Sequence, residues 1–460
     1  MSLISALRTA SASLNVFSRA IDIEGGNVAN AATPGYAAVR SSIQPIGTGA
    51  AVPGSDYISI SSAGDFHADA RVQAATSEAA WSQNRTESLS SIQELFDITG
   101  GSGLLAAFQK FSSAFSDLAV TPNDQTLRST ALSAAGAVAA EFRRAAARLD
   151  SQTLQIDADI RGVASQVNGL TDQIRQLNVQ LRGQAVPDPG VDANRRAALE
   201  DLASLIDITT SVASDGSVSV LTGGRQPLVF GDQVYQLAVD PTAAPLLQVS
   251  SAGGGNSPGT YSGKLGALLD IRNNTLSPLR GGGSDTGSLN TLAKGFASRV
   301  NSLLSNAVSP SGTSGLPVYS YDAANDQNVA RTITLDPTVL PSQLALGSLG
   351  PPAQSNGAAN ALARLFGSSD AADWIQGVSA QNLFSSIATG LGHALASARD
   401  QVSVTRGSLT AAVAERQRIS GVSLDQEAIN ITSLQRYFEA NAKLVGILDS
   451  LTSTEINLIR

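Results

Sequence analysis

The chain has 460 residues, which at about 150 residues per domain predicts about three domains. Its net charge is −8 and it has no long basic run, which argues against a nucleic-acid partner. Cysteine is absent, which excludes disulfides and thiolate chemistry, and no apolar stretch reaches the roughly eighteen residues of a membrane-spanning helix. Polar residues interrupt the N-terminal segment, so a cleaved signal peptide is not expected.

Both ends of the chain carry mostly apolar residues at alternating spacings of three and four. This repeat places side chains on one seam of a helix and favours a coiled coil. The N-terminal seam consists of Leu3, Leu7, Ala10, Leu14, Phe17 and Ile21. The C-terminal seam consists of Leu434, Tyr437, Asn441, Leu444, Leu448, Leu451, Glu455 and Leu458. Because termini usually fray, we expect these seams to bind each other or another chain, with Asn441 and Glu455 as polar residues that set the register.

The N-terminal part of the chain is expected to begin with a helix over residues 1–24, which two following glycines end. Residues 25–65 are expected to form a loop, within which residues 37–65 look extended. A tight turn is predicted at residues 33–36, because Pro34 fixes its own φ and Gly35 tolerates a positive φ. This turn is expected to fix the angle between the first helix and the next segment.

After residue 65 the pattern alternates between helical and extended segments. We expect helices over 66–206, a β-rich insert over 207–265, a helical return over 266–310, a mixed α/β insert over 311–380 and helices over 381–460. Residues 154–182 carry an apolar seam that needs a partner helix. The sequence therefore predicts an α+β multidomain protein, in which 1–206 and 381–460 form an elongated, discontinuous, coiled-coil-like helical domain with β-rich outer inserts.

The sequence contains no constellation of catalytic residues. His67 and His393 are its two histidines, and neither has a carboxylate or a second histidine at metal-ligand spacing. We therefore expect no enzymatic activity, no cofactor, no metal site and no small-molecule substrate. An apolar helical stripe is more often the interior of a monomeric bundle than an interface, and this interpretation stays open for both terminal seams.

Two motifs at opposite ends of the chain resemble the terminal signatures of flagellar rod, hook and hook-associated proteins. They lie in residues 23–36, where an Asn-rich patch precedes Thr-Pro-Gly-Tyr, and in residues 420–443. The residues that carry the resemblance are Asn27, Asn30, Thr33, Gly35, Tyr36, Gly421, Leu424, Asp425 and Asn441. The centre, for example residues 195–208, is more similar to hook-associated proteins than to rod or hook proteins. Gly26 and Gln426 depart from the signatures, which usually have Asn and Glu there.

The resemblance implies a structural protein of the bacterial flagellum that assembles as a ring at the junction of hook and filament. The implied partners are further copies of the chain, the hook protein, the next hook-associated protein, an export chaperone and the flagellar secretion apparatus. The implied location is extracellular, reached through flagellar type III secretion without a cleaved signal peptide. Termini of this family are partly disordered before assembly, and burial of apolar seams offsets the entropy lost when they order.

Two alternatives remain open at the level of sequence. A hook or distal rod protein shares both terminal signatures, but it should be dominated by β structure. A flagellar subunit whose outer insert acts as an adhesin or an enzyme is the other alternative, and an enzyme would need a histidine or carboxylate cluster within residues 207–380.

Overall fold

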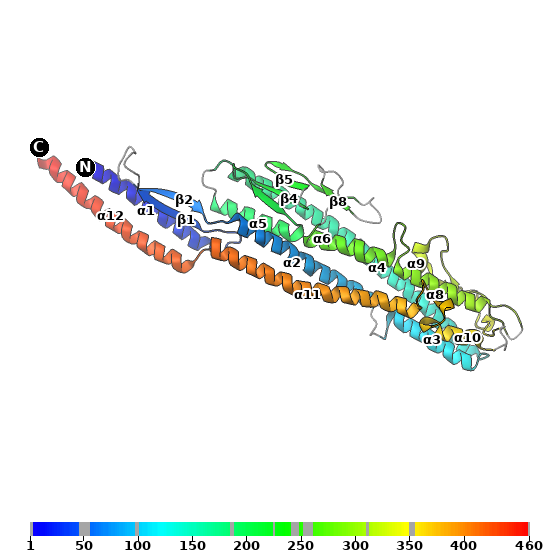
Figure 1. Cartoon of the computed structure of the whole chain (residues 1–460). Helices are drawn as coiled ribbons and strands as arrows, with labels where there is room; N and C mark the ends of the chain where they lie inside the picture. Colours follow the sequence, from blue (N-terminus) through cyan, green and yellow to red (C-terminus); the bar gives the residue numbers. More distant parts are fainter. Residues whose placement is uncertain are drawn as a thin grey trace.

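The protein is an elongated rod of helices whose two termini lie at the same end (Figure 1). The computed structural model describes residues 3–45, 56–96, 101–184, 188–223, 226–240, 248–251, 261–309, 312–348 and 355–458. Helices dominate these residues, and short strands are inserted between them along the chain. The expected α+β class, with an elongated helical assembly from both termini and small β-rich inserts, is therefore confirmed.

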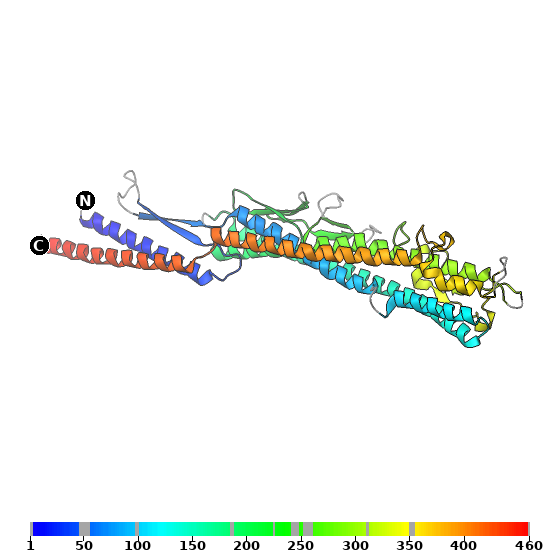
Figure 2. The same cartoon turned by 60° about the horizontal axis from the view of Figure 1, so that its bottom comes forward.

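Long helices packed side by side build the middle of the rod (Figure 2). There α2 (Phe66–Gln93) packs along α11 (Ala380–Ser420), and α4 (Gln125–Leu181) packs along α5 (Pro189–Leu205). With 57 residues, α4 is about 86 Å long at the usual rise per residue. The apolar seam expected on residues 154–182 is buried along α4, and α5 supplies a partner helix.

A small antiparallel sheet flanks α4 (Figure 1). Its strands, in chain order, are β3 (Thr209–Val212), β4 (Val218–Thr222), β5 (Gln226–Phe230) and β6 (Gln233–Val234), and a separate hairpin pairs β7 (Leu237–Asp240) with β8 (Gln248–Ser251). Two asparagines on α4 hold these strands. Asn178 exchanges two hydrogen bonds with the backbone of Val218, at 2.8 and 3.0 Å. Asn168 does the same with Leu237, at 3.0 and 2.7 Å.

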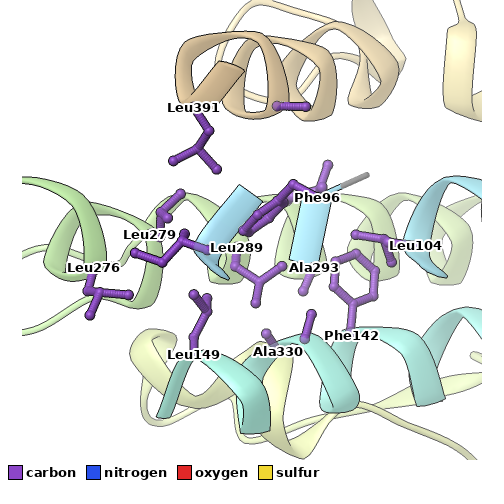
Figure 3. Packing of buried hydrophobic residues seen from close by; sticks show 14 of the residues in the cluster. Phe96, Leu104, Phe142, Leu149, Leu276, Leu279, Leu289, Ala293, Ala330 and Leu391 are labelled. Atoms are coloured by element: carbon purple, nitrogen blue, oxygen red, sulfur yellow. The ribbon is translucent and has the colours of Figure 1, made fainter. Parts of the chain in front are cut away.

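The far end of the rod contains an aromatic core. On α3 (Gly103–Val120), Phe108 stacks on Phe366 with ring centroids 4.3 Å apart. The same ring meets Phe296 of α8 (Ser288–Ser305) edge-on at 4.8 Å. Figure 3 shows neighbouring buried side chains that converge from several helices. The apolar stripe of α3 is therefore interior and not an interface.

The remaining elements are short. The helices are α6 (Gly263–Asp270), α7 (Ser277–Arg280), α9 (Val329–Thr332) and α10 (Gly357–Arg364), with a π-helical segment Ile271–Leu276 between α6 and α7. The strands β9 (Tyr319–Ser320) and β10 (Thr334–Leu335) pair antiparallel. Single turns of 3-10 helix lie at Glu94–Phe96, Asp326–Asn328, Pro341–Gln343, Leu365–Gly367 and Ala371–Asp373.

The N-terminal part corrects two expectations. First, α1 (Leu3–Asn30) does not end at residue 24 but continues through both glycines, although a glycine inside a helix costs about 1 kcal/mol. The side chain of Asn27, in the last turn, is held by tertiary hydrogen bonds that favour the helix over the predicted break.

Second, residues 25–65 are not one loop. Within them β1 (Val39–Pro45) and β2 (Asp56–Ser62) form an antiparallel hairpin that packs on α1. Its register pairs Ile43 with Ile58, so β-branched residues face each other across the strands. The extended character expected of residues 37–65 is therefore seen in both strands, whereas their pairing into a hairpin was not predicted.

Candidate assembly interface

The pair formed by α1 and α12 (Leu424–Leu458) is the end of the rod where the predicted site residues lie (Figures 1 and 2). The two helices run antiparallel and pack against each other. Two polar contacts join them near the base of the pair. Asn27 Nδ2 donates to Glu427 Oε1 at 3.3 Å, and Asn430 Nδ2 donates to Glu24 Oε2 at 3.2 Å.

An aromatic contact shows that the same register continues along the pair. The rings of Phe17 and Tyr437 lie 5.9 Å apart. Phe17 lies seven residues before Glu24, and Tyr437 lies seven residues after Asn430, so equal steps along the two helices keep partners together. At Phe17 and Tyr437, therefore, the two terminal seams meet within one chain.

The predicted N-terminal seam does not coincide with the most buried face of α1 but lies next to it. The fully buried residues of α1 are Ala10, Ser13, Val16, Ala20, Glu24 and Asn27. Most of these side chains are small, so neighbouring elements can approach α1 closely. Of the predicted seam, Ala10 is buried, whereas Leu3, Leu7, Leu14, Phe17 and Ile21 are half-buried.

The C-terminal seam is divided in the same way. Leu434, Asn441 and Leu448 are half-buried, and Tyr437, Leu444, Leu451 and Glu455 are exposed. The side chain of Leu458 lies outside the described part. Asn441 Nδ2 donates to the carbonyl oxygen of Tyr437 in its own helix, at 3.0 Å. A register-setting role of Asn441 and Glu455 therefore stays a prediction for contacts between subunits.

An exposed apolar stripe runs along α12 beside its contact with α1. We call it the α12 stripe, and it consists of Ile429, Tyr437, Leu444, Ile447 and Leu451. These side chains are between 45% and 60% exposed. Their spacing places them on one face of the helix. Exposed apolar side chains that share one face make this face a candidate for an interaction site.

Asn27 is the centre of a buried hydrogen-bond network at the base of the pair. Its Nδ2 donates to the carbonyl oxygen of Val39 at 2.8 Å, and its Oδ1 accepts from the amide of Val39 at 2.9 Å. The hydroxyl of Tyr36 donates to the same Oδ1 at 3.0 Å. Together with the bond to Glu427, one side chain joins α1, the turn, β1 and α12. The signature residues Asn27 and Tyr36 are therefore brought together.

The other N-terminal signature residues shape the turn after α1. Asn30 Nδ2 donates to the carbonyl oxygen of Gly26 at 2.9 Å, and the amide of Thr33 donates to the carbonyl oxygen of Asn30 at 2.9 Å. Gly35 has a φ of 74° and packs against α5. A Cβ added to Gly35 would lie 2.5 Å from the carbonyl oxygen of Ala193, so only glycine fits there without a shift.

The C-terminal signature begins where α11 ends. The amide of Gly421 donates to the carbonyl oxygen of Gln417 at 2.9 Å, which closes α11. Ser420 accepts at its carbonyl oxygen from the amide of Ala38, at 2.9 Å, and at its Oγ from the amide of Asp65, at 3.3 Å. Both ends of the β1–β2 hairpin are thereby tied to the end of α11. Leu424 and Asp425 lie exposed in the first turn of α12.

The turn after α1, the β1–β2 hairpin and the end of α11 form the joint between the terminal pair and the body of the rod. An ion-pair network of the body lies beside this joint. Arg196 of α5 contacts Asp69 of α2 at 3.2 Å and Asp192 at 2.8 Å. Arg416 of α11 contacts Glu200 of α5 and lies 3.9 Å from Asp69. Burial raises the pKa of the Asp69 carboxyl, and Arg196 and Arg416 oppose that rise. The network joins three helices beside the turn at residues 33–36.

Three residues of this site were missed by sequence reasoning: Glu24, Glu427 and Asn430. Their signal was present but weak. Glu24 continues the spacing of the small buried residues of α1, where a carboxylate is unexpected. Glu427 lies in the acidic run of the C-terminal signature, and it is not part of the apolar seam that the spacing predicts.

The described residues offer no metal site, since they contain no group of three or more His, Cys, Asp and Glu residues that could hold an ion. His67 and His393 both lie exposed. Among the helices of the described ranges, none is long and apolar enough to cross a membrane.

Comparisons with known proteins agree with this architecture. Residues 89–319 match the family described as flagellar hook-associated protein FlgK helical domain, and residues 415–458 match the flagellar basal body rod FlgEFG protein C-terminal family. Flagellar hook-associated protein 1 of Bacillus subtilis is 24% identical, over 98% of this chain and 97% of its own length.

A solved structure shows the same fold. The flagellar hook junction protein FlgK from Burkholderia pseudomallei superposes with a TM-score of 0.63 at 15% identity, covering 76% of this chain and all of the other. The family match spans half of the chain and includes the long helices and the sheet beside α4. The chain therefore belongs to the FlgK family of flagellar hook-associated proteins.

Proposed function

We propose that this chain is a structural component of the bacterial flagellum that assembles as a ring at the hook–filament junction and joins hook to filament. The observation that carries the proposal is the α12 stripe, an exposed apolar face on the paired termini of a hook-associated protein. The relatives support the same role, since one is named hook-associated protein 1 and the other a hook junction protein.

The paired termini are the surfaces that would join neighbouring subunits. The α12 stripe and the half-buried residues of both seams leave apolar area in contact with water in the single chain. A neighbouring copy that covers this area gains roughly 25 cal/mol for each square ångström of apolar surface removed from water. Assembly therefore has a driving force that does not require either helix to leave its partner.

The proposed partners follow from this role. They are further copies of the chain, the hook protein, the next hook-associated protein, an export chaperone and the flagellar secretion apparatus. The proposed location is the extracellular flagellum, reached by flagellar type III secretion. The family is a structural one, and we propose that this chain has no enzymatic activity, no nucleic-acid partner and no small-molecule substrate.

The alternative of a hook or distal rod protein is less well supported. The rod-type match covers only residues 415–458, a segment that includes α12. The family match over residues 89–319 covers the long helices, and helices dominate the described residues. A protein dominated by β structure, as expected for a hook protein, does not fit this architecture.

Deletion of the gene in the source bacterium tests the proposal. Electron microscopy of the deletion strain should show hooks without filaments, and flagellin should accumulate in the medium. Supplying the full chain from a plasmid should restore filaments. Filaments of normal length on the deletion strain would exclude the junction role, and loss of the hooks themselves would favour a rod or hook protein.

A further inference from the structure

Two buried carboxyl groups face each other across the terminal helix pair. Glu24 of α1 is 6% exposed and Glu427 of α12 is 7% exposed. They lie in consecutive turns of the antiparallel contact, since Asn27 binds Glu427 and Asn430 binds Glu24. Two carboxylates that are both buried and both ionised repel each other and lose their hydration, so such a pair needs a proton or a cation.

The described groups that contact the pair donate hydrogen bonds and carry no positive charge. Glu24 Oε1 accepts from the hydroxyl of Ser41 at 3.2 Å, and its Oε2 accepts from Asn430. Glu427 Oε1 accepts from Asn27. The remaining oxygen, Glu427 Oε2, is buried and has no hydrogen-bond partner in the described residues. A proton on this oxygen would make it a hydrogen-bond donor.

In the described residues, the groups that contact the pair come from α1 and the turn after it, from β1 and from α12. The turn after α1 contributes Tyr36, whose hydroxyl donates to Asn27 and is neutral near pH 7. Strand β1 contributes Ser41 and the backbone of Val39, and α12 contributes Asn430. The charge that acts on Glu427 comes from Glu24 and has the same sign. A cation to neutralise the pair is therefore not supplied by these groups.

We propose that Glu24 and Glu427 share one proton, and that this proton is a pH-sensitive latch that holds α1 and α12 together. A proton on Glu427 gives Oε2 a donor function toward Glu24, which has spare lone pairs. It also removes one of two like charges from the interface. Loss of the proton leaves two buried anions and weakens the pair. The latch is a property of the single chain, and it holds whether or not the junction role is correct.

The direction of the pH dependence follows from linkage. Burial, and next the interaction with the Glu24 carboxyl, raise the pKa of Glu427 to about 7. In the unfolded chain the same carboxyl titrates at its ordinary value of 4.5. The stabilisation is therefore fully present below pH 4.5 and is lost as the pH rises through about 7. The terminal pair should open on the alkaline side, while α4 should not respond.

Hydrogen exchange resolved by peptide tests the latch on the purified full chain. After correction for intrinsic exchange rates, protection of α1 and α12 should fall by roughly tenfold to a hundredfold between pH 5 and pH 8. Peptides of α4 serve as an internal reference and should keep their protection. Equal protection of the terminal peptides at both pH values would overturn the proposal.

Isosteric variants show whether the pH response of α1 and α12 comes from the proton that Glu24 and Glu427 share. In Glu427→Gln the amide supplies the donor permanently and its oxygen still accepts from Asn27, so protection should become independent of pH. Glu24→Gln should behave in the same way and serves if the first variant folds poorly. Glu439→Gln, at an exposed position of α12, should retain the wild-type pH response. A pH response that persists in both Glu427→Gln and Glu24→Gln would overturn the latch.

A cation bridge is the competing outcome. If millimolar Mg²⁺ or Ca²⁺ restores protection of α1 and α12 at pH 8 in the wild type but not in Glu427→Gln, a metal ion joins the carboxylates and the shared proton is excluded. If neither ion changes protection, the shared proton is supported. None of these outcomes depends on flagellar assembly.

Discussion

At the scale of single residues, Asn27 and Gly35 decide how the terminal helices attach to the rest of the rod. Asn27 uses both ends of its amide, so it joins its own helix to the turn, to β1 and, across the length of the chain, to α12. Gly35 acts by having no side chain, because its positive φ and its contact with Ala193 leave no room for a Cβ. Asn27 supplies hydrogen bonds and Gly35 allows close approach, and together they position the turn after α1 against α5.

Two glycine substitutions test the role of Gly35, and we expect them to change stability in opposite directions. Gly35→Ala should destabilise the joint by about 1–3 kcal/mol, because it combines a strained φ with a steric clash. Gly25→Ala should stabilise α1 by about 1 kcal/mol, because the glycine lies inside a helix and a Cβ there meets no atom within 4 Å. Protection of α1 peptides in hydrogen exchange measures both. Equal effects of the two substitutions would contradict the account of Gly35.

At the scale of elements, one spacing has two different outcomes. On α3 the positions Phe108, Phe111 and Phe115 recur at spacings of three and four and are fully buried in the aromatic core. On α12 the same spacing relates Leu444, Ile447 and Leu451, and these side chains stay exposed. Periodicity shows which side chains share a face of a helix. What covers that face depends on tertiary packing.

A pair of alanine substitutions should separate the two outcomes. Phe108→Ala should lower the free energy of unfolding by about 3–5 kcal/mol, because it leaves a cavity in the aromatic core. Leu444→Ala should change it by less than about 0.5 kcal/mol, because its side chain is exposed in the single chain. Urea unfolding followed by circular dichroism provides both values. A large loss in Leu444→Ala would show that the α12 stripe belongs to a monomeric core.

The same contrast explains how far the sequence could predict this structure. The long helices followed from local periodicity, and the turn at residues 33–36 followed from Pro34 and Gly35. The end of α1 was predicted six residues too early, because local helix propensity cannot register the bonds that Asn27 makes to Val39 and Glu427. The carboxyl pair could not be predicted, because its members lie at opposite ends of the chain.

At the scale of the whole molecule, the chain places its two termini together at one end of a long rod (Figure 1). We propose that residues 1–206 and 381–460 form one discontinuous helical core and that residues 207–265 and 311–380 are its outer inserts, joined through residues 266–310. The body then carries the monomeric core, and the terminal pair carries the contacts between subunits. The joint at Gly35, Ser420 and the ion-pair network connects the body to the terminal pair.

The central claim is that the α12 stripe is a contact between subunits, and a charged double variant tests it most directly. Leu444→Glu with Ile447→Glu places two carboxylates on the stripe, and Gln435→Glu with Ala442→Glu places two on exposed positions of α12 away from it. Each variant is supplied to the deletion strain, and its secretion and its far-ultraviolet circular dichroism are compared with the wild type.

The measurement is the number and length of filaments in electron micrographs of these strains. The account predicts that the stripe variant is folded and secreted at the wild-type level but leaves hooks without filaments, because buried carboxylates oppose stacking of subunits. The control variant should restore filaments. Filaments of normal number and length with the stripe variant would contradict the claim that this surface joins subunits.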